Sequence, residues 1–249
     1  MSDAELVLPS AGPDPISLTT ALAAVLGYAR GRRPLYFRTP NARSGRWVEL
    51  PAFGYERFDR QPVPAGPIGE PDILPAEGLH GRLDPAGWGA MRSVLDDVRP
   101  LADAAIERAA GRPFWELPDD EFSVLAEPRT VGAELRRIRQ RCEETSGVPA
   151  THVAAALHHR RPDLFPLVVR ITRWQLLPHV EEGDSGVEAV IHRELRSNAA
   201  AFDVLHSELA ARDVALTPLR LHDVLLWLAA SLRLTHAVTL GQDGLPLPD

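Results

Sequence analysis

The chain has 249 residues, of which 45% are hydrophobic and 24% charged, a balance typical of a globular protein with one large domain or two small ones. Its net charge of −7 argues against nucleic acid as a partner, because phosphate usually meets a basic surface. All 27 basic residues are arginine, and the absence of lysine excludes Schiff-base lyases, pyridoxal-phosphate enzymes and P-loop nucleotidases.

Two further features narrow the class of protein. No apolar run approaches the roughly 20 residues that span a membrane, and the first ten residues lack the order of a signal peptide, so we expect a cytoplasmic protein with no membrane partner. Cys142 is the only cysteine, which excludes an intramolecular disulfide. We expect this thiol to pack within a helix rather than to act as a nucleophile.

The first 75 residues mix several kinds of element. Residues 1–15 are rich in Pro, Gly and Asp, which predicts a flexible N-terminus. Ser17 is a candidate cap for a helix over 18–30. Short β-prone runs within 35–50 allow a small β-hairpin, and the Pro- and Gly-rich stretch 61–75 predicts a loop.

From about residue 74 onward the apolar pattern is helical, which predicts an all-α fold class and a helical bundle. We expect one domain over 16–235 and a C-terminal tail over 236–249. The segment 186–211 is expected to bend or break near Ser197 and Asn198. The predicted helices are 84–98, 101–110, 130–141, 151–160, 168–177, 186–211 and 219–232.

Residues 131–174 contain the most informative pattern of the sequence. It consists of a helix, a tight turn at 147–149, a second helix, a Pro-bounded break and a third helix. This arrangement resembles the helix-hairpin-helix core of the base-excision DNA glycosylase superfamily. The resemblance implies a core of that kind, in which the hairpin contacts a DNA phosphate and a lysine and an aspartate carry the chemistry.

The chain departs from that family at each functional position. Thr151 stands where the family has its lysine, and Val169 where it has the catalytic aspartate. Pro149 replaces a hairpin glycine and has no N–H to offer a phosphate. A valine can neither stabilise an oxocarbenium-like sugar nor accept a proton, so we do not expect base excision by the family's mechanism.

A closer resemblance covers about 70–232, to an uncharacterised family of actinobacterial proteins distantly related to those glycosylases. It rests on His159-Arg160-Arg161-Pro162, on the run 165–169, and on the Arg-x-x-Asp-x-x-x-Trp pattern of 220–227. The middle run departs from the family where Val169 replaces a carboxylate. The resemblance implies no particular function.

The sequence offers two groups of candidate site residues. The first group follows the turn at 147–149. There His159 is a candidate general acid or base. The arginines near it are candidates for binding phosphate or carboxylate, and they are Arg160, Arg161, Arg170 and Arg173. The alternative is a solvated helix end whose cations favour the helix dipole.

The second group lies on the last predicted helix. Asp223 shares a helix face with Arg220 and Trp227, which makes Asp223 a candidate catalytic carboxylate and the other two candidate substrate-binding residues. Asp223 sits among apolar residues, where burial raises a carboxyl pKa. The alternative is an Arg–Asp pair that fixes this helix to the core.

Other polar groups form no recognisable site. Asp72, Glu77 and His80 fall in a Pro- and Gly-interrupted segment, and such loops often carry chemistry. Their spacing matches no metal-binding signature, so we predict no metal and no cofactor.

These observations favour a repurposed enzyme with a glycosylase-like fold. It would act on a small, anionic molecule, of the kind made in specialised-metabolite biosynthesis, by general acid–base chemistry. One alternative is a non-catalytic nucleic-acid- or protein-binding module; another is a DNA glycosylase with a displaced carboxylate such as Asp223. The sequence predicts neither an oligomeric state nor a role for 35–75.

Overall fold

The computed structural model describes residues 5–40, 43–144 and 150–242, and over these ranges the protein is mostly helical, as predicted. The α-helices are α1 (Leu18–Arg30), α2 (Ile73–His80), α3 (Pro85–Ala109), α4 (Val131–Glu144), α5 (Ala150–Arg160), α6 (Arg170–Leu176), α7 (Val187–Ser197), α8 (Ala199–Ala210), α9 (Pro218–Ala230) and α10 (Leu234–Gln242).

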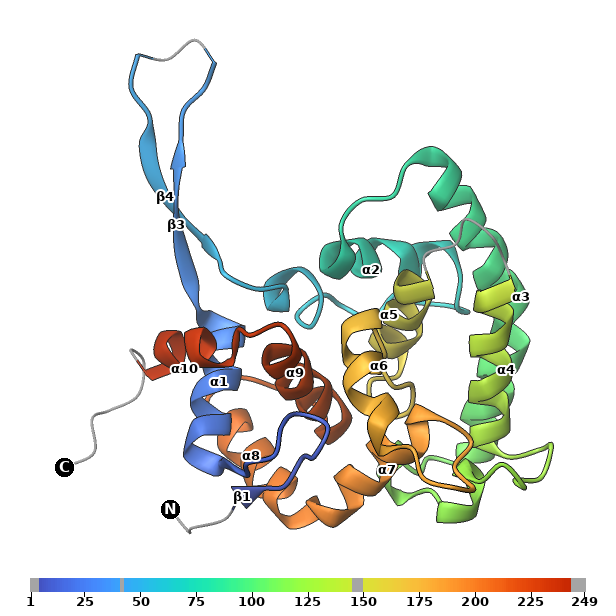
Figure 1. Cartoon of the computed structure of the whole chain (residues 1–249). Helices are drawn as coiled ribbons and strands as arrows, with labels where there is room; N and C mark the ends of the chain where they lie inside the picture. The colour runs from blue at the N-terminus through green and yellow to red at the C-terminus, as the bar shows by residue number, and fades with distance from the viewer. Residues whose placement is uncertain (1–4, 41–42, 145–149, 243–249) are drawn as a thin grey trace.

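The helices gather in two groups joined through a middle pair (Figure 1). On one side α1 packs against α8, α9 and α10, and on the other α3 packs against α4 and α5, with α2 against α5. Between them, α6 and α7 contact each other, and both contact α9. Helix α9 therefore faces the middle of the molecule.

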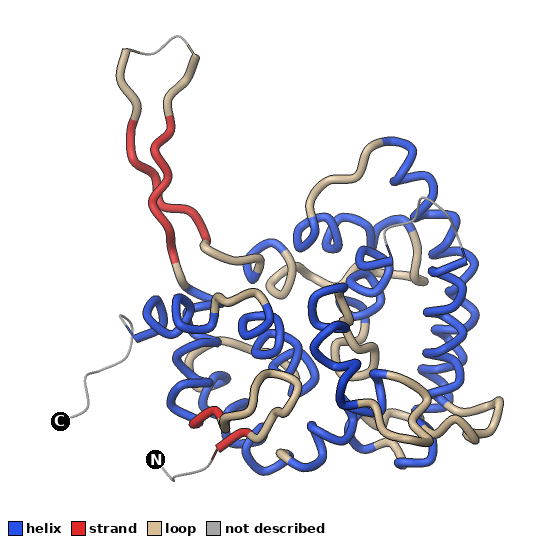
Figure 2. The backbone as a smooth tube through the Cα atoms, viewed as in Figure 1, coloured by secondary structure: helices blue, strands red, loops and turns tan. Residues whose placement is uncertain are grey.

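Two strands, β3 (Arg32–Phe37) and β4 (Arg46–Pro51), form an antiparallel hairpin that we call the β-arm, residues 32–51. The pairing runs from Arg32 opposite Pro51 to Phe37 opposite Arg46. The arm extends away from the helices, and every residue of β3 is exposed (Figures 1 and 2). The small β-hairpin expected within 35–50 is therefore confirmed.

The N-terminal segment differs from the flexible chain that we expected. Residues 5–17 form a small antiparallel strand pair, β1 (Glu5–Leu6) with β2 (Ile16–Ser17). The Asn198 side chain binds the backbone of Val7, donating to its carbonyl at 2.8 Å and accepting from its N–H at 2.7 Å. These contacts join positions almost two hundred residues apart, so the local composition does not reveal them.

A buried carboxylate fixes the same segment. Ser10 donates from its backbone N–H and its hydroxyl to Glu194, at 2.8 and 2.7 Å, and His222 contacts the same carboxylate at 2.7 Å. These contacts outweigh the effect of burial and lower the pKa of Glu194. The N-terminus, α7 and α9 are thus joined through one charged group.

The C-terminal helix packs closely on the first one. A side-chain carbon added at Gly27 would lie 1.8 Å from the carbonyl oxygen of Ala237, and one added at Gly241 would lie 1.8 Å from that of Ala23. Only glycine allows the backbones of α1 and α10 to approach so closely. Residues 236–242, expected in a tail, belong to this packed pair, and 243–249 lie outside the described residues.

Helix boundaries follow the predicted caps. Ser17 accepts a hydrogen bond from Thr20 N at 3.2 Å at the start of α1. The break expected near Asn198 separates α7 from α8.

In contrast, α3 is one helix through Pro100, where we expected two. The buried face formed by Val98 and Ala102 continues across the proline.

The glycosylase-like core stays a prediction. The turn expected at 147–149 lies outside the described residues. Helices α4 and α5 on either side agree with the predicted helices at 130–141 and 151–160.

No single described helix is long and apolar enough to cross a membrane. One pair, α9 with α10, has the length and composition together, but the two helices are bent by 116° at the break between them.

Candidate functional site

A buried polar cluster is centred on Arg220, in the first turn of α9. Its Nε and Nη2 donate to the two oxygens of Asp59 at 2.7 and 3.2 Å, and Nη2 also donates to the Tyr28 hydroxyl at 2.8 Å. Tyr28 in turn donates to Asp59 at 2.7 Å. The remaining nitrogen, Nη1, donates to Oδ2 of Asp223, one helical turn along.

This cluster is buried. Arg220 and Asp59 each leave only 4% of their side chains exposed, and the guanidinium carbon lies 5.1 Å from the centre of the Phe58 ring. With these contacts Arg220 is fully engaged within the protein. Its contact with Asp223 fixes that side chain on the same helix. Its contacts with Tyr28 and Asp59 join α9 to α1 and to the segment after the β-arm.

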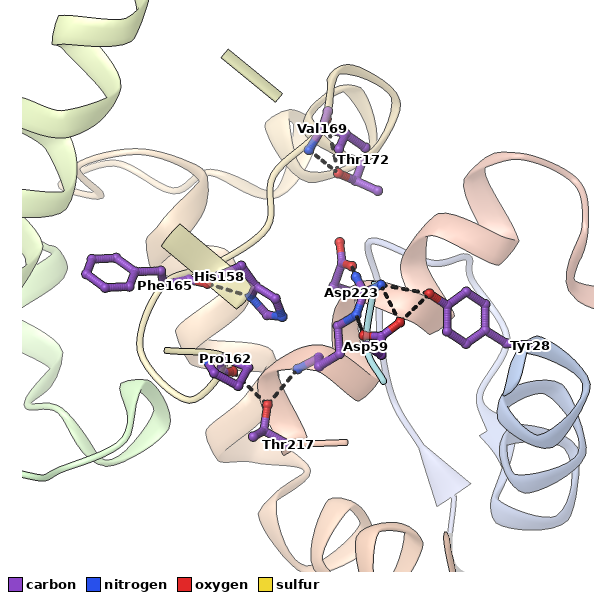
Figure 3. Close-up of polar contacts among 10 residues, drawn as sticks. Tyr28, Asp59, His158, Pro162, Phe165, Val169, Thr172, Thr217 and Asp223 are labelled. Atoms are coloured by element: carbon purple, nitrogen blue, oxygen red, sulfur yellow. Dashed lines mark hydrogen bonds and ion pairs between the residues drawn. The ribbon is translucent and has the colours of Figure 1, made fainter. Parts of the chain in front are cut away.

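Asp223 differs from its neighbours because only one of its oxygens is engaged. Oδ2 accepts from Arg220, whereas Oδ1 makes no hydrogen bond with any described residue. Figure 3 places Asp223 at the centre of the group, with Tyr28 to one side, His158 to the other and Val169 above. A buried carboxyl with a free oxygen is able to exchange a proton with a bound molecule.

Burial raises the pKa of Asp223 from 3.8 to about 6, against the opposing influence of the Arg220 and His222 side chains. The raised pKa agrees with the expectation drawn from the apolar helix around Asp223. Near neutral pH this carboxyl is accordingly close to the point at which it gains or loses a proton.

Asp223 lines a pocket of about 390 Å³, which we call the Asp223 pocket. Its wall is formed by the end of α1, the base of the β-arm, the segment after β4, the end of α2, the residues before α6, and α9. Trp227 and Phe53 form an aromatic part of this wall, with ring centres 6.1 Å apart and planes at 88°.

Three arginines on the wall lack a carboxylate partner. Arg33, Arg57 and Arg233 line the pocket, and none of them makes an ion pair with another described residue. Arg233 lies over the Trp227 ring, 5.5 Å from its centre. Because Arg220 is already neutralised, these three cations give the pocket its positive character.

His80, at the end of α2, also lines the pocket. Burial and the nearby His152 ring lower the pKa of His80 to about 4, so the imidazole is neutral at pH 7. Its Nε2 is buried and has no partner among the described residues. A buried polar atom without a partner in a pocket wall is one that a ligand can satisfy.

The first group of predicted site residues is placed elsewhere. His159 packs against Phe58, with ring centres 5.4 Å apart, and its Nε2 contacts the Gln61 carbonyl at 3.1 Å. Arg160 donates from Nε and Nη2 to the two carboxylate oxygens of the buried Asp72, at 3.0 and 2.7 Å. These contacts hold the 61–72 loop against α5.

The remaining arginines of that group also lie outside the Asp223 pocket. Arg161 pairs with Asp163 at 2.9 Å. Arg170 and Arg173 line a second, more apolar pocket of about 270 Å³ between α4, α5 and α6, where Arg173 pairs with Glu143. The structure thus brings Asp223, Arg220 and Trp227 together and separates them from the basic group beside the hairpin.

Val169 lies on the wall of two pockets. It precedes α6, where Thr172 accepts from its N–H at 3.1 Å and donates back to its carbonyl at 3.0 Å. Val169 lines the Asp223 pocket as well as the second pocket, which Thr151 also lines. Val169 therefore faces the same space as Asp223.

Sequence reasoning missed several pocket residues. Tyr28, Phe53, Arg33, Arg57 and Arg233 come from segments that are remote from one another in the chain. None of them carries a motif, and only the fold brings them together. His80 had been noted for its loop-like context alone.

No group of three or more His, Cys, Asp or Glu side chains converges as metal ligands within the part of the chain that the structure describes.

Comparison with known proteins yields one match. A family of unknown function, DUF6308, matches residues 35–230, a span that includes most of the β-arm and most of the Asp223 pocket. No curated protein matches the chain, and no solved structure does. The chain belongs to DUF6308, a family of unknown function.

Proposed function

We propose that the protein is an enzyme that binds a small, anionic molecule in the Asp223 pocket and transfers a proton through the Asp223 carboxyl. The observation that carries this proposal is the position of Asp223 Oδ1, which is unpaired on the wall of a cationic pocket while Oδ2 is held by Arg220. One oxygen fixes the orientation of the group and the other is available to a ligand.

The anionic character of the ligand follows from the charges on the wall. Arg33, Arg57 and Arg233 face the pocket without an acidic partner, and guanidinium groups bind carboxylates and phosphates through paired hydrogen bonds. A pocket of about 390 Å³ is within the range of small-molecule sites. We place the acid group of the ligand near these three arginines.

The aromatic wall supports a ligand with a flat, apolar part. Trp227 and Phe53 lie at right angles, and Trp227 presents one ring face to the guanidinium of Arg233. A planar group that stacks on Trp227 would replace water on an apolar surface. His80 Nε2 offers a further hydrogen bond.

Asp223 suits general acid–base catalysis because its pKa of about 6 lies near physiological pH. At pH 7 the group is mainly ionised but readily protonated, so it is able to remove a proton and to return it. Arg220 positions the Asp223 carboxyl, and its own nitrogens are already engaged by Asp59, Asp223 and Tyr28.

The test is a binding screen of small aromatic carboxylates and nucleoside monophosphates by thermal shift and calorimetry. A ligand should bind the wild type and lose about tenfold or more in affinity in Arg233→Ser and in Trp227→Ala. Arg129→Ser, which removes an exposed arginine outside the pocket, is the matched control and should bind normally. Loss of affinity in the control to the same degree, or no ligand from either class, would refute the proposal.

A second candidate is a DNA glycosylase whose carboxylate is displaced to Asp223. It is favoured by one observation, that Val169 and Asp223 line the same pocket. It requires abasic-site formation on damaged duplex, abolished by Asp223→Asn. An inert wild-type protein on a broad panel of lesions would eliminate it.

A further inference from the structure

The β-arm differs from the rest of the chain in charge. Residues 32–51 hold five arginines and one glutamate, whereas the whole chain has a net charge of −7. Arg32 pairs with Glu56 at 2.6 Å. The other four, Arg33, Arg38, Arg43 and Arg46, make no ion pair with any described residue. The arm is a basic projection from an acidic body.

The arm also presents aromatic rings to solvent on both of its faces. Tyr36 and Trp47 are cross-strand partners on one face, with ring centres 5.3 Å apart and side chains 51% and 69% exposed. Phe37, half exposed, lies on the other face opposite Arg46. Exposed rings beside unpaired arginines are the combination on which successive bases stack while the backbone phosphates are neutralised.

The acidity of the body has little effect at the end of the arm. Five steps of about 3.3 Å along the strand place Phe37 and its partner Arg46 roughly 17 Å from the base of the arm. The Debye length is about 8 Å at physiological ionic strength, so these residues are more than two screening lengths away. The negative net charge argued against nucleic acid as a partner of the chain as a whole, but that argument does not hold for the β-arm.

The order of residues along the arm separates nucleic acid from a lipid surface. The rings lie within the strands, whereas Arg38 and Arg43 lie beyond them, towards the far end. An arm that entered a bilayer would bury these arginines before its rings, at a large cost in free energy. A strand of nucleic acid, in contrast, would contact both kinds of side chain: its bases would stack on the rings and its phosphates would pair with the arginines.

We propose that the β-arm is a binding element for single-stranded nucleic acid, with Tyr36, Phe37 and Trp47 stacking on bases and the arginines contacting phosphates. This inference does not depend on what the Asp223 pocket binds. It assigns a role to residues 35–50, for which the sequence alone suggested none.

The experiment is fluorescence anisotropy of the full chain with a labelled oligothymidine of about 20 nucleotides over a series of salt concentrations. Three phosphate contacts, from Arg38, Arg43 and Arg46, predict a slope of about −2 for the logarithm of affinity against that of salt. The Arg38→Ser, Arg46→Ser double variant should reduce the slope by about 1.4 units. Trp47→Ala should weaken binding about tenfold with the slope unchanged, and Trp47→Phe should restore most of the loss.

The matched control is the Arg82→Ser, Arg129→Ser double variant, which changes the net charge equally at exposed positions outside the arm and should bind like the wild type. Unchanged melting temperatures in all variants show that the body stays folded. The proposal fails if no binding occurs at about 20 mM salt, if the control loses as much as the arm variants, or if Trp47→Ala binds normally. It also fails if a duplex of the same length binds equally tightly, or if the arm instead joins two copies into a dimer that Trp47→Ala dissociates.

Discussion

Replacing Arg220 by glutamine tests the structural role of the guanidinium at the centre of the site. The variant would leave Asp59 and Asp223 buried without their common cation, and Tyr28 without its donor. Removing one partner from a buried, hydrogen-bonded ion pair typically costs about 3–5 kcal/mol. We expect a loss of this size in the free energy of unfolding at pH 7, because Arg220 is only 4% exposed.

The loss should depend on pH in a defined direction. Arg220 lowers the pKa of Asp223, which burial holds at about 6, so its removal raises that pKa further. A carboxyl with a raised pKa in the folded state costs stability as pH rises through that pKa, and protonation relieves the cost. The variant should therefore lose less near pH 5 than near pH 8.

The assay is urea denaturation followed by circular dichroism at several pH values. Arg196→Gln is the matched control, since Arg196 also pairs with a carboxylate, Asp119, but both side chains are largely exposed. Its loss should stay within about 1 kcal/mol. A loss of under about 1 kcal/mol for Arg220→Gln, or equal losses in the two variants, would refute the buried-pair explanation.

Two further predictions concern packing and protonation. Gly27→Ala should lower the free energy of unfolding by about 1–3 kcal/mol, because the added methyl group would collide with the Ala237 carbonyl. The control is Gly89→Ala on α3, where an added methyl group contacts nothing and should be neutral or stabilising. Equal effects of the two variants in a denaturant titration would contradict this explanation. His80 stays neutral in the folded protein with a pKa of about 4 and takes up a proton on unfolding below its ordinary value of 6.5, so it destabilises the fold as pH falls. The loss of stability between pH 8 and pH 5 should be smaller by about 2 kcal/mol in His80→Gln, and an unchanged loss would show that His80 is not held neutral.

The sequence predicted those elements of the fold that local patterns determine. The Ser17 cap, the α7–α8 break at Asn198 and the hairpin within 35–50 depend on residues close to one another in the chain. The ordering of residues 5–17 was missed, because Val7 is fixed by Asn198 and Ser10 by Glu194 of α7, both remote in the chain. Composition alone made that segment look loosely attached.

The site was predictable only in part, for the same reason. The spacing of Arg220, Asp223 and Trp227 placed them on one helix face, and the structure puts all three on the wall of one pocket. The partners that define their chemistry, Asp59 and Tyr28, come from remote segments with no motif. Long-range packing therefore decides which of the candidate charges are free to meet a ligand.

Arg160 illustrates the converse case. Its position in a cluster of basic residues suggested an anion site, yet it is occupied by the buried Asp72, 88 residues away in the chain. A run of arginines in sequence does not distinguish cations that already have an internal partner from those that do not. Arg57 and Arg233, which belong to no such run, line the Asp223 pocket without an acidic partner among the described residues.

The most direct test of the central claim is a site-specific titration of the Asp223 carboxyl carbon by carbon-13 NMR, with its resonance assigned by comparison with Asp223→Asn. Proton exchange by Asp223 near neutral pH is the basis of the proposed catalysis. The structure predicts a midpoint at about pH 6. A midpoint at the ordinary value of 3.8 would show a permanently ionised partner of Arg220 and would contradict the proposed role.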